Sequence, residues 1–295
     1  MDLVICLYHR FVLKEGPLQQ QSNRKASVRE TKLRLPAASR QRRNRLLTLS
    51  TWVVILLVWL AITSFKLVSP VMVPSPYSVV TSFLTMLRDG YNGIPLWQHL
   101  GISFARLLAA FLLAALSGIP LGLLSGYFSP VRAVVDSIVQ FYRPLPPLAY
   151  YTLLILWLGI DERSKLTLLY LAALAPIYVS CVSAVTRVGR DYLLSARSLG
   201  ADSRQVFFHI VLPACLPEIF TGMRTAIGVA YTTLVAAEMV AATSGIGWMV
   251  IDASRYLKSR VMFVGIIIMG LTGVLIDQLM RLLERKFVYW GGDRR

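Results

Sequence analysis

Residues 46–65 read LLTLSTWVVILLVWLAITSF, a run of twenty positions without a charged side chain, bounded by Arg45 and Lys66. The hydrocarbon core of a bilayer is about 30 Å thick, and a helix needs roughly 20 apolar residues to cross it. Lipid offers no hydrogen-bond partner to a free N–H or C=O group, so the run satisfies its backbone only as a helix. This stretch predicts a transmembrane helix.

Five more apolar stretches follow along the chain, and the fifth of the six carries an acid, Glu238. The pattern predicts an all-α polytopic membrane protein of about six transmembrane helices, in one membrane domain over 46–285. We expect a cytoplasmic connection over 188–216 between the fourth and fifth spans and a cytoplasmic tail over 286–295. The predicted spans are 46–66, 98–127, 133–160, 165–187, 217–242 and 260–283.

The composition supports the same class of protein. The chain is 56% hydrophobic and 16% charged, whereas soluble domains carry about 25% charged residues. Its net charge of +16 is concentrated in the first 46 residues and in short loops beside apolar segments. This distribution is typical of a basic cytoplasmic face against lipid, so we expect no nucleic-acid partner. We expect residues 1–45 to form a basic, disordered cytoplasmic tail.

The placement of Lys and Arg predicts the orientation in the membrane. With the N-terminus in the cytoplasm, 23 Lys and Arg residues fall on inner segments and six fall in outer loops. Cytoplasmic loops carry the excess of positive charge in membrane proteins. We therefore expect a multi-pass protein of the cell (inner) membrane with both termini in the cytoplasm.

Several function classes lack their motifs in this sequence. No G-x-x-x-x-G-K-[ST] string is present, so we expect that the chain is no enzyme and binds no nucleotide or other cofactor. The G-x-S-x-G and G-x-G-D motifs of intramembrane proteases are also missing from the sequence. An ion-gradient-driven secondary transporter remains a distant alternative, although we find no clear repeat and no central charge cluster. The scattered cysteines and histidines predict neither disulfides nor a metal site: Cys6, Cys181, Cys215, His9, His99 and His209.

The cytoplasmic connection between the fourth and fifth spans has an ordered pattern. Residues 191–199 have helical spacing, and Gly200 can end that helix because glycine tolerates a left-handed backbone. Asp202 can cap a second helix, with Gln205 three residues later in a capping box. We expect this second helix to end at Pro213. The pattern predicts a helix–Gly–helix elbow at the cytoplasmic surface.

This elbow resembles the E-A-A-x-x-x-G-x₉-I-x-L-P loop of ABC importer permeases, with Leu194 in the position of the Glu and Ser195 in that of the first Ala. The resemblance implies a type I ABC importer permease fold. It also implies that the elbow is the coupling element that docks on an ATP-binding subunit. The residues that match the loop's positions are Leu194, Ser195, Ala196, Gly200, Ile210, Leu212 and Pro213.

Three further stretches, 97–100, 142–149 and 233–238, resemble the nitrate/sulfonate/taurine branch of these permeases, and residues 142–149 are most similar to taurine permeases. The resemblance implies a small organic anion or zwitterion as solute: taurine first, then other aliphatic sulfonates or nitrate. It implies a second copy of the chain, two ATP-binding subunits and an extracytoplasmic solute-binding protein as partners. ATP and Mg would be used by the ATP-binding subunits.

Two intramembrane positions invite alternative hypotheses. Glu238 either pairs with Arg106 of the second span or lines the solute path, because an ionisable group in the membrane interior needs a partner or water. Arg143 is followed by three prolines that break the helix entering the third span. It either lines the path or anchors the helix at the inner face. The prolines are Pro144, Pro146 and Pro147.

Two other features are a polar contact that we interpret as scaffold and an outer loop. Asp277 and Arg281 are spaced i, i+4 on the sixth helix, and we expect them to hold Arg224 of the fifth. Residues 244–248 read as a flexible outer loop in which Trp248 is an aromatic anchor at the membrane interface.

Overall fold

The computed structural model describes residues 37–288. It divides into two units, one ending at Leu67 and one beginning at Val68. Within the described residues the secondary structure is helical, apart from one isolated bridge between Tyr91 and Ile94. The prediction of an all-α protein is confirmed.

The first unit contains one described helix, α3 (Ala37–Ser64). The predicted boundary between a disordered tail and the first span lay at residue 46, but the helix begins nine residues earlier. Residues 37–45 are mostly Ala, Arg and Gln, which favour helix intrinsically, so the apolar helix extends back through them. The rest of the predicted tail lies outside the described residues.

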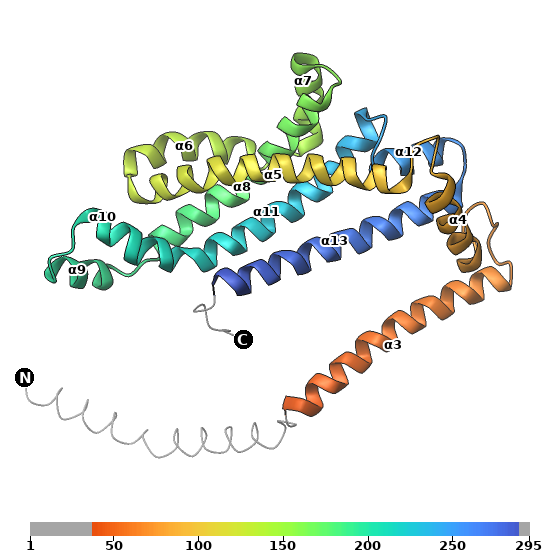
Figure 1. The fold of residues 1–295 in the computed structure, drawn as a ribbon, viewed down its shortest axis with the longest axis horizontal. Coiled ribbons are helices and arrows are strands. Elements are labelled where there is room, and N and C mark those ends of the chain that lie inside the picture. Colours follow the sequence, from red (N-terminus) through yellow and green to blue (C-terminus); the bar gives the residue numbers. More distant parts are fainter. Residues whose placement is uncertain (1–36, 289–295) are drawn as a thin grey trace, which may run out of the picture. The chain divides into compact units, whose positions relative to one another are not determined.

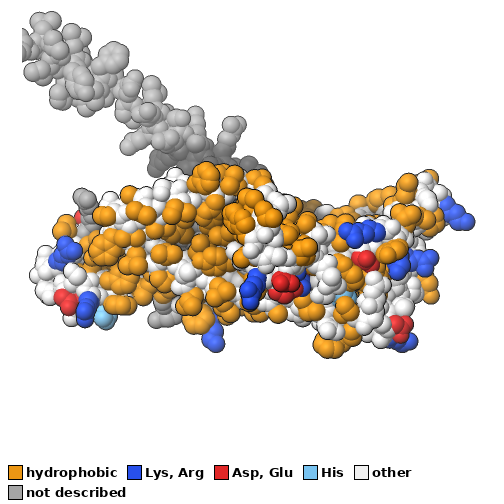
Figure 2. All heavy atoms as spheres, turned by 90° about the horizontal axis from the view of Figure 1, so that it is seen from above, with side chains coloured by type: hydrophobic (Ala, Val, Ile, Leu, Met, Phe, Trp, Pro, Cys, Tyr) orange, Lys and Arg blue, Asp and Glu red, His pale blue; other side chains and the backbone are white. Residues whose placement is uncertain are grey.

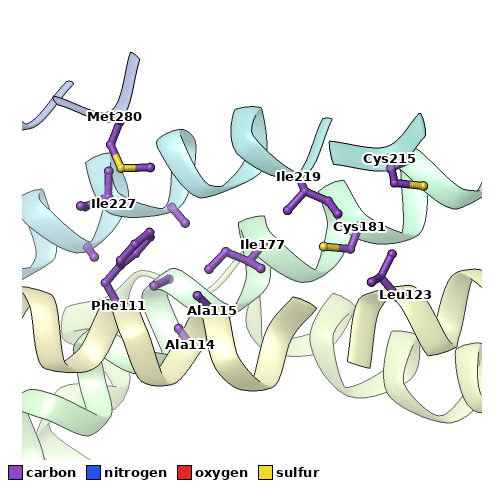
Figure 3. Close-up of a cluster of buried hydrophobic side chains, with 14 of the residues drawn as sticks. Phe111, Ala114, Ala115, Leu123, Ile177, Cys181, Cys215, Ile219, Ile227 and Met280 are labelled. Atoms are coloured by element: carbon purple, nitrogen blue, oxygen red, sulfur yellow. The ribbon is translucent and has the colours of Figure 1, made fainter. Parts of the chain in front are cut away.

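The core of the second unit is formed by three long helices, α5 (Leu96–Tyr127), α8 (Glu162–Thr186) and α11 (Leu212–Ala241) (Figure 1). Helix α8 packs along both α5 and α11. Figure 3 shows the side chains at this junction, with Phe111 and Leu123 from α5, Ile177 and Cys181 from α8, and Ile219 from α11. These helices correspond to the second, fourth and fifth predicted spans.

Glycines bring these helices close together. A Cβ on Gly122 of α5 would lie 2.5 Å from the Cβ of Cys181 on α8. A Cβ on Gly222 of α11 would lie 2.3 Å from the Cβ of Ser180. Membrane helices have no hydrophobic driving force between them and rely on close contact of small residues. The close contacts of α8 with α5 and α11 therefore require glycine at these two positions, because a side chain there would overlap the neighbouring helix.

The predicted third span, 133–160, is two helices rather than one. Helix α6 (Ser129–Tyr142) ends before Arg143, and α7 (Pro147–Leu158) begins after the prolines. Pro144 and Pro146 have no N–H to continue the hydrogen-bond ladder, and Pro147 is accommodated in the first turn of α7, where an N–H has no helical acceptor. The break that the prolines predicted is present.

The remaining short helices lie toward the two ends of the bundle, whereas α13 (Ser259–Phe287) runs alongside α11 (Figure 1). Helix α4 (Pro76–Asp89) contacts α13, and α12 (Ile246–Arg255) packs against α11 and α13. At the opposite end, α9 (Arg190–Ser198), α10 (Ser203–Val206) and the π-helix η1 (Phe207–Val211) connect α8 to α11.

The outer surface of the helices is apolar. Figure 2 shows a wide expanse of hydrophobic side chains with few charged ones among them. Among residues 37–288, five helical stretches are long and apolar enough to cross a membrane, and the 12-residue α7 is a shorter apolar helix. Leu112, Leu116 and Leu275 are more than half exposed on such stretches. The structure thus agrees with a multi-pass membrane protein.

Candidate functional site

The end of α9 has the hydrogen bonds of a Schellman motif. Gly200 donates its N–H to the Arg197 carbonyl at 3.0 Å, and Ala201 donates to the Ala196 carbonyl at 3.1 Å. Gly200 has φ +86, the left-handed conformation that this motif requires. A Cβ at Gly200 would meet no atom within 4 Å. Within this chain the glycine is thus needed for its backbone conformation rather than for a close contact.

The second helix of the elbow starts with the predicted capping box. Asp202 Oδ1 accepts the Gln205 N–H at 2.6 Å, and the Asp202 N–H donates to Gln205 Oε1 at 3.0 Å. Two N–H groups that have no partner inside the helix are therefore satisfied reciprocally. This part of the sequence prediction is confirmed.

The prediction that this second helix ends at Pro213 is wrong. The chain stays helical from Ser203 through α10, η1 and α11 to Ala241, a stretch of 39 residues. Pro213 has no N–H, but it lies in the first turn of α11, where the wider π-helical turn precedes it and Leu212 donates to the Phe207 carbonyl. Because a π turn shifts the hydrogen-bond register, the helix passes the proline without breaking.

The elbow presents apolar side chains to its surroundings. Leu199 is 89% exposed, and Tyr192, Leu194 and Phe208 are also exposed. Ser195 and Gly200 are exposed as well, Ile210, Leu212 and Pro213 are half-buried, and Ala196 is buried. Tyr192, Ala196 and Leu199 lie at helical spacing in α9, and of these three only Ala196 is buried. No other part of the described residues covers these exposed apolar side chains.

At the other end of α11, Arg106 of α5 occupies the centre of a charged cluster. Its guanidinium makes a bidentate pair with Glu162 at the start of α8, with both distances 2.6 Å. Nη1 also donates to Glu238 Oε1 at 2.8 Å and to the Ser244 carbonyl at 2.9 Å. The Glu238 side chain is 1% exposed and that of Arg106 is 6% exposed. The structure places the hypothesised Arg106–Glu238 pair in direct contact.

Glu238 also caps helix α12. Its Oε2 accepts the Gly247 N–H at 2.9 Å, and its Oε1 accepts the Ser103 hydroxyl at 2.7 Å. Ser103 Oγ in turn accepts the Ile246 N–H at 3.0 Å, and His99 Nδ1 accepts the Gly245 N–H at 3.1 Å. The first N–H groups of a helix have no partner within it. Here side chains from two other helices supply the acceptors.

The prediction of a flexible loop over 244–248 is therefore wrong. Gly245 has φ +119, and a Cβ there would lie 2.4 Å from Glu238 Cδ, so the turn presses against the carboxylate. Trp248 stacks on His99 with ring centroids 5.6 Å apart rather than serving as a free anchor. The local sequence reads as flexible because it contains two glycines, whereas the glycines are there to let the backbone approach Glu238.

A second polar contact supports α12 from the connection between α4 and α5. The Tyr91 hydroxyl and the Asn92 side-chain amide both donate to Asp252 Oδ2 at 2.9 Å. Burial, together with the adjacent Asp252 carboxylate, raises the pKa of the Tyr91 hydroxyl above its ordinary value. The tyrosine thus stays a neutral donor to α12.

Arg143 and its prolines lie apart from the Arg106 cluster. Arg143 lines two adjacent hollows, of about 470 Å³ and 360 Å³, that lack both Arg106 and Glu238. Pro144 lines the larger hollow and Pro147 the smaller, while Pro146 is exposed. The Arg106–Glu238 pair and Arg143 with its prolines thus lie in two separate places in the structure.

The predicted scaffold pair is present. Asp277 accepts a hydrogen bond from Arg224 of α11 and forms an ion pair with Arg281 one turn later, both at 2.7 Å. Sequence reasoning missed Glu162, Ser103 and Ser244 as members of the cluster around Arg106. Glu162 lies in the first turn of a helix, where the helix dipole favours an acidic residue. The sequence therefore gives no separate indication that Glu162 also binds Arg106.

The chain is similar to known transport proteins. Residues 118–289 match the family described as binding-protein-dependent transport system inner membrane component. The taurine transport system permease protein TauC of Escherichia coli (strain K12) is 39% identical over 272 residues, covering 92% of this chain and 98% of that protein. The putative aliphatic sulfonates transport permease protein SsuC of the same strain is 38% identical over 83% of this chain and 93% of its own length.

More distant similarities agree. The nitrate import permease protein NrtB of Synechocystis sp. is 32% identical over 72% of this chain and 78% of its own length. Among solved structures, a chain of the MetNI methionine ABC transporter in an inward facing conformation aligns with a TM-score of 0.54 and 17% identity. That alignment covers 62% of this chain and 92% of the other. At this identity it supports the fold alone.

Proposed function

The chain belongs to the binding-protein-dependent transport system inner membrane components, in the branch of taurine, aliphatic sulfonate and nitrate permeases, and on this premise we propose that it imports taurine. The observation that carries the choice of taurine is the 39% identity to TauC over nearly the full length of both chains. The motif over 142–149 supports the same choice.

Other solutes of this branch are the second candidates. SsuC relatives from Bacillus subtilis and Escherichia coli are 36% and 38% identical over at least 80% of this chain. Aliphatic sulfonates therefore rank directly after taurine, and nitrate follows with the weaker NrtB similarity. All three solutes present oxyanions that an arginine can bind through charge-assisted hydrogen bonds.

The family implies ATP-binding subunits and a solute-binding protein as partners. In our proposal two copies of this chain form the membrane part, and two separate subunits bind and hydrolyse ATP with Mg. The binding protein delivers the solute at the extracytoplasmic face. Both termini lie in the cytoplasm, which puts the elbow on the side of the ATP-binding subunits.

The elbow is proposed to couple ATP hydrolysis to transport. Its exposed apolar side chains, Tyr192, Leu194, Leu199 and Phe208, suit a surface that a partner covers. The Schellman motif and the capping box hold the two helices of the elbow at a defined turn. A defined turn transmits displacement of its tip better than a flexible loop does.

Helix α11 is proposed to carry that displacement across the membrane. The unbroken helical stretch from Ser203 to Ala241 is roughly 58 Å long. Glu238 near its far end is bound to α5 through Arg106 and to α12 through Gly247. A movement of the elbow would reach α5 and α12 together, as alternating access by rigid-body motion requires.

The test is ATP-dependent uptake by the reconstituted importer. The chain would be co-purified with the ATP-binding subunits, placed in proteoliposomes and supplied with its binding protein. We expect labelled taurine to enter only with ATP, and unlabelled taurine to compete better than ethanesulfonate or nitrate. Uptake that needs an ion gradient and continues without ATP would support a secondary transporter instead.

A further inference from the structure

The two hollows beside Arg143 share a wall. Arg143 of the α6–α7 break and Val179 of α8 line both of them. The larger hollow extends along α6 to Arg132, and the smaller one extends along α7 and α11 to Tyr150 and Thr225. Arg143 therefore stands where the two hollows meet.

This junction lies inside the membrane domain rather than at its edge. Val179 precedes the last residue of α8, Thr186, by seven positions, which is about 10 Å of helix. Thr225 lies near the middle of the helical stretch that begins at Ser203. The two hollows thus run from the cytoplasmic end of the bundle toward its centre.

Arg143 is exposed and, like several other arginines of the described residues, has no acidic partner there. Among the described residues on the walls of the two hollows, the only carboxylate is Asp136. It is already bound to Arg132 at 3.2 Å and to the Tyr178 hydroxyl at 2.6 Å. Since that acid is neutralised by Arg132, Arg143 leaves the hollows with a net positive charge.

The wall of the smaller hollow also contains a backbone acceptor without its helical partner. Pro176 and Ala172 of α8 both line this hollow, and because Pro176 has no N–H, the Ala172 carbonyl lacks the donor that would close its helical turn. Proline is tolerated inside a membrane helix because neighbouring groups or water satisfy the freed carbonyl.

We propose that Arg143 and these two hollows form the inner half of the solute path, with Arg143 pairing with the sulfonate group of a small organic anion as it passes. The guanidinium donates to the sulfonate oxygens. The Ala172 carbonyl can accept a hydrogen bond from the ammonium group of a zwitterion such as taurine. Hollows of 360–470 Å³ fall in the range of small-molecule sites.

The inference deepens the proposed import function and rests on it. The same oxyanion chemistry could come from a lipid phosphate that holds Arg143 at the inner face. The experiments must therefore separate a passing solute from a bound lipid headgroup, and a failure at Arg143 from a failure of the import function itself.

The first experiment measures local charge in the assembled importer. Thr225 is exposed in the smaller hollow, and Cys181 and Cys215 are buried, so a Thr225→Cys chain that also carries Cys6→Ser has one reporter thiol. It is treated with a sulfonatoethyl methanethiosulfonate and with the trimethylammonium analogue. We expect about tenfold faster reaction with the sulfonate reagent, because a local positive field concentrates anions.

Addition of Arg143→Gln should bring the two labelling rates close to each other, and excess taurine should slow the sulfonate reagent when Arg143 is present. Absence of labelling, or a rate ratio unaffected by Arg143→Gln, would overturn the assignment of the path.

The second experiment measures transport in proteoliposomes with ATP and the binding protein. Arg143→Gln should lower taurine uptake about ten- to hundredfold, the effect of losing a charge-assisted hydrogen bond. ATPase stimulation by the binding protein should persist, and Arg143→Lys should recover part of the uptake. Arg281→Gln is the matched control, since Asp277 keeps its contact with Arg224. Its uptake should equal that of the wild type.

The outcomes are distinguishable. If the wild-type importer takes up no sulfonate, the proposed function fails. If the wild type transports and Arg143→Gln matches it, only the role of Arg143 fails. Parallel vesicles of pure phosphatidylcholine and of phosphatidylcholine with phosphatidylglycerol separate the two sources of oxyanion. A defect that appears only with the anionic lipid, together with loss of subunit assembly, would assign Arg143 to a lipid headgroup and overturn the proposal.

Discussion

The two ends of the helical stretch Ser203–Ala241 differ in their surroundings: one exposes apolar side chains, and the other buries charged ones. At the end that begins at Ser203, the elbow exposes apolar side chains, and its own hydrogen bonds close within a few residues, as between Asp202 and Gln205. At the end that carries Glu238, this side chain is 1% exposed and its partners come from α5 and α12. One end exposes an apolar surface that we propose a partner covers, and the other pairs its buried charges within the chain.

The difference shows which end can be understood from residues close together in the sequence. A surface that another subunit covers must keep its shape before the partner arrives, so short-range caps hold it. A buried charge must be paired at once, because an unpaired charge in a low-dielectric interior is strongly destabilising. Substitutions at the two ends should therefore differ in kind: we expect those around Glu238 to affect stability and those in the elbow to affect coupling.

The largest effect should come from Glu238→Leu. It removes the carboxylate from Arg106 and leaves the Gly247 N–H without an acceptor. Breaking one side of a buried ion pair costs about 3–5 kcal/mol. We expect a severe loss of folded protein, measured as yield and as the thermal unfolding midpoint in detergent.

Glu238→Gln keeps an oxygen for one of these contacts and should lose less. If Glu238→Gln assembles and transports like the wild type, Glu238 is neither an essential partner of Arg106 nor part of the solute path, and the contrast between the two ends disappears.

Gly245→Ala should rank second. The substitution places a Cβ 2.4 Å from Glu238 Cδ at a backbone φ of +119, so strain and overlap act together. We expect about 3 kcal/mol of destabilisation, measured as the unfolding midpoint. Gly270→Ala is the control, because its Cβ would meet nothing within 4 Å on helix α13. A smaller loss at Gly245 than at Gly270 would refute the tight turn.

Gly200→Trp should affect coupling more than stability. The left-handed backbone costs roughly 1–2 kcal/mol for a residue with a side chain, and a Cβ at Gly200 would meet no atom within 4 Å. We expect normal membrane insertion together with loss of transport-linked ATPase activity in the reconstituted importer. Gly93 has φ +78 and equally open surroundings, so Gly93→Trp should keep that activity. Equal behaviour of the two variants would argue against the elbow as the coupling element.

The smallest effect should come from Glu218→Gln. Glu218 pairs with Arg187 at 2.8 Å, but the Arg187 side chain is 71% exposed. Exposed pairs contribute about 0–1 kcal/mol. We expect a shift in the unfolding midpoint close to the error of the measurement, which decreases further with added salt. A loss approaching that of Glu238→Leu would show that burial is not what separates the two ion pairs.

Much of the fold follows from short stretches of sequence. The run over 46–65, the prolines after Arg143 and the Asp202–Gln205 box each act within one or two helical turns, and each predicted feature is present. The errors came where distant residues decide, or where the helix changes its register. Pro213 reads as a helix end until the π turn of η1 is seen, and residues 244–248 read as flexible until Glu238 is placed beside Gly245.

The amino-acid sequence by itself determined that this is a membrane protein, where most of its apolar helices lie and how the elbow turns. Lipid offers no hydrogen bonds to the backbone, so apolar length alone forces helices, and caps act between close neighbours. Only the tertiary structure decided that Glu162, Glu238 and Ser244 meet around Arg106, and that Arg143 lies beside two hollows without an acidic partner among the described residues. Lipid and protein interior are equally apolar, so hydrophobic pattern does not reveal which faces of the helices pack together.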